Sequence, residues 1–392
     1  MSAEPPTREI AVLTTGRQDW GILHSTSVAI REHPGLRLRL LVGGMHLSGR
    51  HGLTVSTIEA DGFRPDARLA WLADDGDLPA DVQAAGALAA IGEDLRRATP
   101  DAIVLAGDRF ETAAAAVAAT VARTPIVHLH GGEQTLGSFD DALRHAITKM
   151  SHLHLVSHPE HRARVIAMGE DPAMVQVVGA PGLDAAARTD LPTRVELAEA
   201  LGIALEPPLV IVTVHPATLE AEPAAVAHAV VQAMDAVPAT YVITLPNADP
   251  GAEEVRSALL RAAEGRDRVA VDALGERSYW GLLRIADAML GNSSSGIVEA
   301  PAVDLPAVDV GDRQAGRRHE ANVLHAAVDP AEIAAALRRA LDPATRAAVA
   351  GAHPVLADGR AGARVADIIA AWQPARPPRK PPIDVGPMSP RA

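Results

Sequence analysis

The chain has 392 residues, which is too long for a single ordinary hydrophobic core and fits two domains of common size. Its formal net charge of -13, with basic residues scattered along the chain, excludes nucleic acid as an expected partner, because a phosphodiester backbone would be repelled. The absence of cysteine excludes disulfides and thiolate metal sites.

The N-terminal residues and the apolar runs bear on where the protein works. The N-terminus lacks the pattern of a signal peptide, and charged residues or histidines cut every candidate run of about 18 apolar residues. We therefore expect a cytoplasmic protein that does not span a membrane.

Short apolar runs alternate with longer segments of helical period in the first part of the chain. The predicted strands are residues 10–13, 36–42, 102–105, 126–129 and 153–156, and the predicted helices are residues 20–32, 80–97, 111–122 and 140–150. This alternation is typical of parallel strands connected by helices. We therefore predict a Rossmann-like, doubly wound domain over residues 1–185.

A break at residues 181–208 separates this part from the next. It holds one short predicted helix, residues 194–201, and ends in Glu206-Pro207-Pro208, which cannot continue a helix. The alternation then resumes, with predicted strands at residues 209–214, 239–244, 269–271, 288–290 and 307–310. We therefore predict a second Rossmann-like domain over residues 186–360.

The C-terminal segment contains a last helical pattern, residues 361–372, and a tail rich in proline, residues 374–392. The composition of the tail cannot build a core, and we expect it to be disordered. The predicted fold class is therefore α/β, with two doubly wound domains facing a cleft. The carboxyl ends of both sheets would border that cleft, where small ligands bind in open α/β sheets.

Two glycine-containing turns follow the first two predicted strands. Thr15-Gly16-Arg17 leads into a helix, and backbone amides at a helix start together with an arginine suit a phosphate. An ordinary strand-to-helix turn with a surface arginine is the alternative. Gly43-Gly44-Met45-His46 follows the second strand, and a tight turn explains its glycines equally well.

Acidic residues and histidines follow the next two strands. Asp108 could transfer a proton while Arg109 holds an anion, although an Asp N-cap with a local ion pair is an equal alternative. In His130-Gly131-Gly132-Glu133, the glycines let the chain approach a ligand before it presents Glu133. Glu133 and Asp140 suit acid–base work without a metal. We expect no metal, because the pair of His128 and His130 lacks a clear third ligand.

The second domain carries polar groups directly after its predicted strands. His215 could meet a leaving-group phosphate, and Asn247 offers both a donor and an acceptor, but turns would explain either. Gly291-Asn292-Ser293-Ser294-Ser295-Gly296 is the sharpest signal, since small hydroxyl residues and free amides at a helix start cradle phosphate oxygens. Glu299 could accept hydrogen bonds from ribose hydroxyls. Arg313 adds a cation, with a surface ion pair as its alternative.

These motifs together resemble the UDP-N-acetylglucosamine 2-epimerase family, in its hydrolysing branch that feeds sialic-acid-type sugars. The resemblance runs from Ile10 to Val323, through TTGRQDWG, GGMHLS, GDRFE, HLHGGEQT, RHAITKMSHLHLVS, VGAPGLD, HPATLE, PNADPG, GNSSSGIVEAP and GDRQAGR in that order. It implies a GT-B-like pair of Rossmann domains, with the last helix, residues 361–373, packed on the first. Some members place a glutamate where this chain has His130, so which group is the base stays open.

The resemblance also implies roles by position, and it implies no cofactor. The expected catalytic residues are Asp108, Glu133, Asp140, His130 and His215, and the expected UDP-sugar ligands are Arg17, His46, Arg109, Asn247, Ser293, Ser294, Glu299 and Arg313. The implied reaction eliminates UDP from UDP-N-acetylglucosamine, passes through a 2-acetamidoglycal, and adds water to give N-acetylmannosamine.

Three alternatives remain open. The first is the same chemistry on a UDP-2,4-diacetamido-2,4,6-trideoxyhexose, whose C4 and C6 contacts the sequence does not reveal. The others are a GT-B glycosyltransferase and a non-catalytic UDP-sugar sensor, because fold alone does not settle function. We expect a homo-oligomer, which is the general default.

Overall fold

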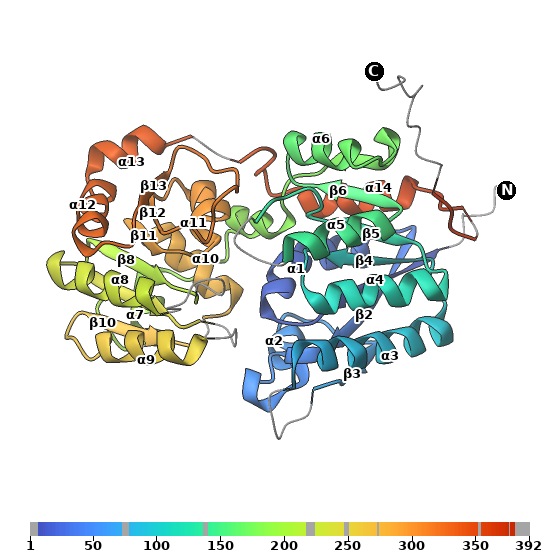
Figure 1. Cartoon of the computed structure of the whole chain (residues 1–392), viewed down its shortest axis with the longest axis horizontal. Helices are drawn as coiled ribbons and strands as arrows, with labels where there is room; N and C mark the ends of the chain where they lie inside the picture. The colour runs from blue at the N-terminus through green and yellow to red at the C-terminus, as the bar shows by residue number, and fades with distance from the viewer. Residues whose placement is uncertain are drawn as a thin grey trace, which may run out of the picture. The chain divides into compact units, whose positions relative to one another are not determined.

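The computed structural model describes residues 7–72, 78–135, 140–216, 224–246, 251–272, 274–351, 354–375 and 377–380. The chain divides into two compact units. Unit 1 comprises Met1–Glu133, Asp140–Gly182 and Arg360–Ala392, and unit 2 comprises Gln134–Phe139 and Leu183–Gly359. Each unit holds one parallel sheet covered by helices on both faces (Figure 1).

The sheet of unit 1 has seven strands in the order β3-β2-β1-β4-β5-β6-β7, all parallel. The strands are β1 Arg8–Thr14, β2 Leu36–Gly43, β3 Ala67–Leu69, β4 Ala102–Ala106, β5 Ile126–Leu129, β6 Leu153–Val156 and β7 Val175–Val177. The order reverses between β1 and β4. In open α/β sheets ligands bind at such a switch point, outside the carboxyl ends of the strands.

Helices cover both faces of this sheet because its strands are apolar on both sides. Ile10 and Val12 of β1 share a core with α1 Arg17–Glu32, α2 Val55–Ala60 and α14 Ala361–Ala371. Ala11 and Leu13 of the same strand point the other way, because side chains alternate along a strand. They share a second core with α3 Ala80–Ala98, α4 Phe110–Ala122 and α5 Asp140–Met150. The remaining helix of unit 1, α6, spans Pro159–Ala167 and follows β6.

The last helix returns to unit 1 after the chain has built unit 2. Figure 1 shows α14, in red, among the blue and green elements of unit 1. It packs along α1, and the Arg8 guanidinium of β1 donates to the carbonyl of Trp372 at 2.6 Å. Beyond the helix, Lys380 Nζ lies 2.5 Å from Oε2 of the buried Glu170. Residue 376 and residues 381–392 of the proline-rich tail lie outside the described part of the chain.

The sheet of unit 2 has six parallel strands in the order β10-β9-β8-β11-β12-β13. The strands are β8 Leu209–Thr213, β9 Thr240–Thr244, β10 Arg268–Val271, β11 Ala288–Gly291, β12 Ala307–Val310 and β13 Val323–Ala326. This order repeats that of unit 1, with the switch point between β8 and β11. The fold class predicted from the sequence, two Rossmann-like doubly wound sheets, is confirmed.

The helices of unit 2 also divide between the two faces of the sheet. The core on one face is formed with α8 Ala225–Ala236, α9 Ala252–Ala262 and α12 Pro330–Ala340. On the other face, α11 Ser295–Val298 packs Gly296 against Ala307 and Met289, while α7 Arg194–Leu201 packs on α10 Gly275–Ile285. A further helix, α13, spans Pro343–Val349. Within the ranges that the structure describes, no helix has both the length and the apolar character needed to cross a bilayer.

Candidate functional site

The turn after β1 stands at the switch point of the first sheet. Thr15 donates to Oδ2 of Asp19 through its backbone amide at 3.0 Å and through its hydroxyl at 2.5 Å. Burial raises the pKa of the Asp19 carboxyl, although Arg109 and the Thr15 hydroxyl oppose this shift. Arg17, the first residue of α1, is exposed at the same turn. The internal hydrogen bonds therefore fix the turn that presents Arg17.

The predicted acid and base after β4 do not pair with each other. Arg109 forms a two-pronged ion pair with Glu111, with its Nε and Nη2 at 3.2 and 3.0 Å from the two carboxylate oxygens. Arg109, not Asp108, is the N-cap residue of α4, and its side chain makes no capping hydrogen bond. The alternative of an Asp N-cap is therefore wrong, and Asp108 keeps its carboxylate for another partner.

That partner is Arg144 of α5, whose side chain is only 2% exposed. Its Nη2 donates to Oδ2 of Asp108, and its Nη1 donates to the backbone carbonyl of Glu133 at 2.9 Å and to Oδ1 of Asp141 at 2.8 Å. Arg144 was not among the predicted site residues. A buried guanidinium thus ties the loop after β4 to the loop after β5, and each loop carries a predicted catalytic carboxylate.

The histidine within β5 and the histidine directly after it have different surroundings. His128 is buried, donates from Nε2 to the Gly107 carbonyl at 2.9 Å, and has its pKa lowered to about 3 by burial. His130 instead donates from Nδ1 to Oε1 of Glu133 at 2.8 Å. Its buried Nε2 has no hydrogen-bond partner within the described residues. No group of three or more potential metal ligands occurs within those residues.

The backbone at His130 is strained. Its φ of 62° lies in the left-handed region, which costs a non-glycine residue on the order of 1–3 kcal/mol. Such strain clusters where a side chain must be presented in one orientation. Here it directs His130 toward Glu133, with which it forms a hydrogen-bonded dyad.

Two other predicted residues of unit 1 have different positions. His46 is fully buried, and its Nε2 and Nδ1 each pair with a threonine hydroxyl at 2.8 Å, from Thr14 and Thr54. Burial lowers its pKa to about 4, so the ring is neutral and both nitrogens are engaged inside the protein. Asp140 is the first residue of α5 and is partly buried. It therefore stands in the same helix as Arg144, one turn earlier.

In unit 2 a buried asparagine joins the loops after two strands. Asn292 accepts from the His215 amide at 2.7 Å and donates to the His215 carbonyl at 2.9 Å. Its own carbonyl accepts from Arg313 at 3.1 Å and from Gln314 at 2.9 Å. Asn292 was not predicted as a site residue. It fixes the backbone of His215 and holds the Arg313 guanidinium beside the start of α11.

The serine-rich turn begins directly after β11. A Cβ at Gly291, where φ is 140°, would lie 1.9 Å from the Thr213 carbonyl, so only glycine fits there. Ser294 is the N-cap residue of α11 but makes no capping hydrogen bond with its side chain. The hydroxyl of Ser295 pairs with that of Tyr279, and burial raises the pKa of Tyr279 well above its usual range. The Ser293 hydroxyl accepts from the Ser295 amide at 3.3 Å, so helix capping explains one of the three serines and not the other two.

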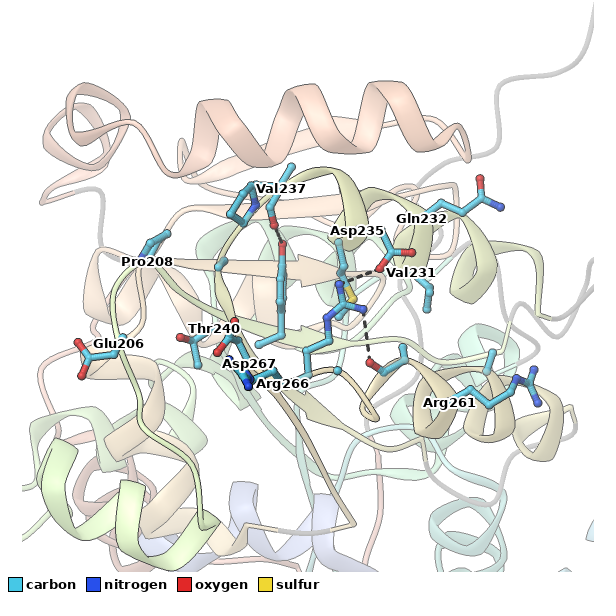
Figure 2. Close-up of a pocket in the computed structure, with 18 of the residues that line it drawn as sticks. Glu206, Pro208, Val231, Gln232, Asp235, Val237, Thr240, Arg261, Arg266 and Asp267 are labelled. Atoms are coloured by element: carbon cyan, nitrogen blue, oxygen red, sulfur yellow. Dashed lines mark hydrogen bonds and ion pairs between the residues drawn. The ribbon is translucent and has the colours of Figure 1, made fainter.

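Asn247 lies outside the described residues. A cavity of about 1000 Å³ in unit 2 is lined at the amino ends of β8, β9 and β10 by Pro208, Thr240 and Arg268 (Figure 2). Ser293 and His215 follow the carboxyl ends of the strands, at the opposite end of the sheet. No predicted site residue lines this cavity. A second cavity, of about 770 Å³ in unit 1, lies beside Trp372 and Lys380 and likewise contains no predicted residue.

The fold and these groups define a class of protein. Each unit is a doubly wound sheet that gathers polar side chains outside the carboxyl ends of its switch-point strands, as nucleotide-binding α/β proteins do. A family model described as UDP-N-acetylglucosamine 2-epimerase matches residues 28–370. The chain belongs to the UDP-N-acetylglucosamine 2-epimerase family and is an enzyme of the UDP-sugar 2-epimerase type.

Individual proteins support this membership. The chain is 34% identical to the UDP-N,N'-diacetylbacillosamine 2-epimerase (hydrolyzing) of Legionella pneumophila, over 86% of this chain and 89% of that protein. It is 30% identical to the UDP-N-acetylglucosamine 2-epimerase of Neisseria meningitidis, over 85% and 87%. The crystal structure of the UDP-GlcNAc 2-epimerase from Neisseria meningitidis bound to UDP-GlcNAc has the same fold, with a TM-score of 0.76, 14% identity, and coverage of 93% and 100%.

Proposed function

We propose that the chain is a hydrolysing 2-epimerase that converts UDP-N-acetylglucosamine and water into N-acetylmannosamine and UDP. The observation that carries this proposal is the buried Arg144, which bonds both the Asp108 carboxylate and the backbone of the Glu133 loop. Inversion at C2 needs proton-handling groups on two faces of the sugar ring. Two acidic loops held together by one buried cation offer candidates for these groups.

The chemistry requires the two C2 protons to be handled in separate steps. In the first step a base removes the proton from C2, the C1–O bond breaks, and its electron pair leaves with UDP, which forms a C1=C2 double bond. In the second step water adds its hydroxyl to C1 and gives its proton to a base, while an acid returns a proton to C2 on the other face. Asp108, Asp140 and the dyad of His130 and Glu133 are the groups that we assign to these transfers.

Unit 2 has the complementary task of stabilising charge on the leaving diphosphate. Arg313, the His215 loop and the serine-rich turn offer a cation and hydrogen-bond donors at the carboxyl ends of β8, β11 and β12. Donors and dipoles aimed at a developing anion are often the largest single contribution to catalysis. We assign Arg17, Arg109, Asn247 and Glu299 to binding of the same nucleotide.

The sugar is the part of the proposal with a specific rival. The Legionella relative acts, by its name, on UDP-N,N'-diacetylbacillosamine, and the Neisseria relative on UDP-N-acetylglucosamine, at 34% and 30% identity to this chain. Measuring kcat/KM with UDP-N-acetylglucosamine and with a UDP-2,4-diacetamido-2,4,6-trideoxyhexose therefore decides between them. A ratio above about tenfold corresponds to about 1.4 kcal/mol of transition-state preference and identifies the substrate.

Incubation of the protein with UDP-N-acetylglucosamine in deuterated water tests the reaction itself. We expect phosphorus NMR to show free UDP, and proton NMR to show N-acetylmannosamine with deuterium at C2. A glycosyltransferase would leave the donor intact until an acceptor is added. A sensor would bind UDP-sugar without consuming either sugar nucleotide. The Glu133→Gln variant, prepared in the same way, controls for contaminating epimerase.

We also propose that the protein works in the cytoplasm as a homo-oligomer, since most soluble oligomers are homo-oligomers. Multi-angle light scattering of the purified protein measures its mass in solution. A mass equal to that of one chain at micromolar concentration would contradict this part of the proposal.

A further inference from the structure

A chain of hydrogen bonds reaches Glu133 from α6. Oε1 of Glu133, which already accepts from His130, also accepts from the Ser157 hydroxyl at 2.9 Å. Ser157 lies 2.9 Å from Nδ1 of His161. Neither Ser157 nor His161 was predicted as a site residue. We infer that Ser157 and His161 are positioning residues that hold the Glu133 carboxylate for proton transfer, an inference that rests on the proposed function for the role of Glu133.

The donor and acceptor at each step of this hydrogen-bond chain can be assigned. A carboxylate oxygen only accepts, so the Ser157 hydrogen points to Glu133, and the Ser157 oxygen is left to accept from Nδ1–H of His161. Burial lowers the pKa of His161 to about 4, although Glu133 opposes this shift, so the ring is neutral and carries one N–H. That proton is on Nδ1, because the contact with Ser157 requires a donor there.

The backbone around this chain is held by the same helix. A Cβ on Gly132, where φ is 77°, would lie 2.4 Å from the His161 carbonyl, so the loop before Glu133 packs directly on the first turns of α6. The Arg164 guanidinium of α6 also donates to the Gly132 carbonyl. The helix thus fixes the position of the loop, and Ser157 then fixes the orientation of the side chain that the loop presents.

Two donors on one carboxylate oxygen have a chemical consequence. They restrict rotation of the Glu133 carboxylate and hold it in one orientation relative to His130. Supporting hydrogen bonds of this kind act through the group that they orient, and in other sites their loss lowers activity by about 10–100-fold. Removal of the Ser157 hydroxyl should therefore lower turnover without removing any group that touches the substrate.

The test compares Ser157→Thr with Ser157→Val, which have nearly the same shape and differ in the hydroxyl. We expect S157T to keep kcat within about threefold of the native value and S157V to lose about 10–100-fold, with KM changed less than about threefold in both. Equal losses in S157T and S157V would show that packing alone is involved and would overturn the inference. Native turnover in S157V would overturn it as well.

A double-mutant cycle with His161→Phe tests whether the two residues act in one chain. We expect H161F to lower kcat in the native background and to have less effect in the S157V background, because the hydrogen bonds that connect His161 to Glu133 pass through Ser157. If the double mutant lost kcat by the product of the two single-mutant factors, the two residues would act independently, which would contradict the inference.

A crystal structure of S157V separates failure of the inference from failure of the proposed function. We expect the Glu133 carboxylate to rotate away from His130 while the backbone of residues 130–133 stays in place. If the native protein released no UDP from either sugar nucleotide, the proposed function would fail, but this structure would still decide the inference. If the Glu133 carboxylate kept its native orientation in S157V, the inference would be refuted.

Discussion

The side chain of Arg144 is nearly inaccessible to solvent, yet it satisfies acceptors from three separate parts of unit 1. A buried cation that loses its partners is costly, and so is a carboxylate that loses a buried cation. The role of Arg144 in orienting Asp108 can therefore be tested through both stability and turnover.

We predict that Arg144→Met lowers kcat by at least about 100-fold, because Asp108 loses the partner that orients it. The same change should lower the free energy of unfolding by about 3 kcal/mol, near the low end for a broken buried pair, since the Asp108 side chain is 23% exposed. Urea denaturation and steady-state kinetics measure the two effects. The control is Arg97→Met, in a pair whose arginine is 72% exposed, which should cost less than about 1 kcal/mol and leave kcat unchanged.

Glu170 is a second buried charge, at the amino end of the same sheet. Burial works to raise the pKa of this carboxyl, but hydrogen bonds from His154, Lys149 and Lys380 prevail and lower it to about 2. A folded-state pKa below the unfolded value of about 4.5 contributes stability above pH 4.5, and this contribution is lost as the pH falls toward 2.

We therefore predict that Glu170→Gln is less stable than the native protein by on the order of 2–3 kcal/mol at pH 7. This difference should shrink between pH 4.5 and pH 2, because the native carboxylate becomes protonated there. Urea denaturation at pH 7.5, 4.5 and 3 measures it. A difference that stays constant over this range would show that packing, and not charge, accounts for the loss.

From the sequence, residues with candidate chemical roles were easier to identify than the residues that form hydrogen bonds with them. Asp108, Glu133 and Arg313 stand out because each follows a predicted strand. Arg144 does not, since it lies within a helix. Asn292 follows a predicted strand, but an asparagine in a turn has many ordinary explanations. Their partners lie 36 and 77 positions away in the chain, and only the folded sheet brings them together.

At the scale of elements, the interior strands were predictable, whereas of the four edge strands only β10 was predicted. Strands such as β4 and β8 are buried along their whole length and are almost entirely apolar, so their predicted bounds match the structure to within one residue. The edge strands β3, β7 and β13 have only three, three and four residues. Each contains polar residues, because one side of an edge strand needs no apolar neighbour, and none of the three was predicted.

The start of α11 is another element whose role depends on a neighbour. The hydroxyl of Ser295 pairs with Tyr279 of α10, which links two helices on the same face of the sheet of unit 2. A helix of four residues has little stability of its own, so its first turn depends on such contacts.

We predict that Tyr279→Phe weakens UDP binding by about 3–10-fold, which corresponds to the net value of one hydrogen bond of about 1 kcal/mol. Isothermal titration calorimetry measures this affinity. The chain has one other tyrosine, Tyr241, which lies near the amino end of β9. Its hydroxyl donates to the Val237 carbonyl at 2.5 Å. Tyr241→Phe should lower stability and leave UDP affinity unchanged, and an equal loss of affinity in both variants would contradict the prediction.

At the scale of the whole molecule, the proposed proton-handling residues and the main candidates for the diphosphate lie in different units, although Arg17 and Arg109 of unit 1 are also assigned to the nucleotide. The candidate proton-handling residues Asp108, Glu133, Asp140 and His130 belong to unit 1, and the serine-rich turn and Arg313 belong to unit 2. Because both units repeat one sheet order, the fold alone gives no reason for this division. It follows instead from which side chains stand after the switch-point strands of each sheet.

This division predicts two separable phenotypes. Glu133→Gln and Asp108→Asn should bind UDP within about twofold of the native affinity and lose about 10²–10⁴-fold in turnover, the usual worth of a general acid or base. Ser294→Ala and Arg313→Ala should weaken UDP binding by about 1.5–3 kcal/mol, or roughly 10–150-fold, because they remove hydrogen bonds to a charged group. Calorimetry with UDP and NMR assays of turnover measure the two quantities on the same preparations.

The control for Arg313 is Arg318→Ala in the same segment, where the arginine pairs with Glu320 at 3.1 Å and should leave UDP affinity unchanged. If E133Q weakened UDP binding as much as R313A does, Glu133 would be a nucleotide ligand and not a proton-handling group. If R313A retained native UDP affinity, the diphosphate would have to bind elsewhere in unit 2. Either result would remove the division of chemistry between the units on which the proposed reaction depends.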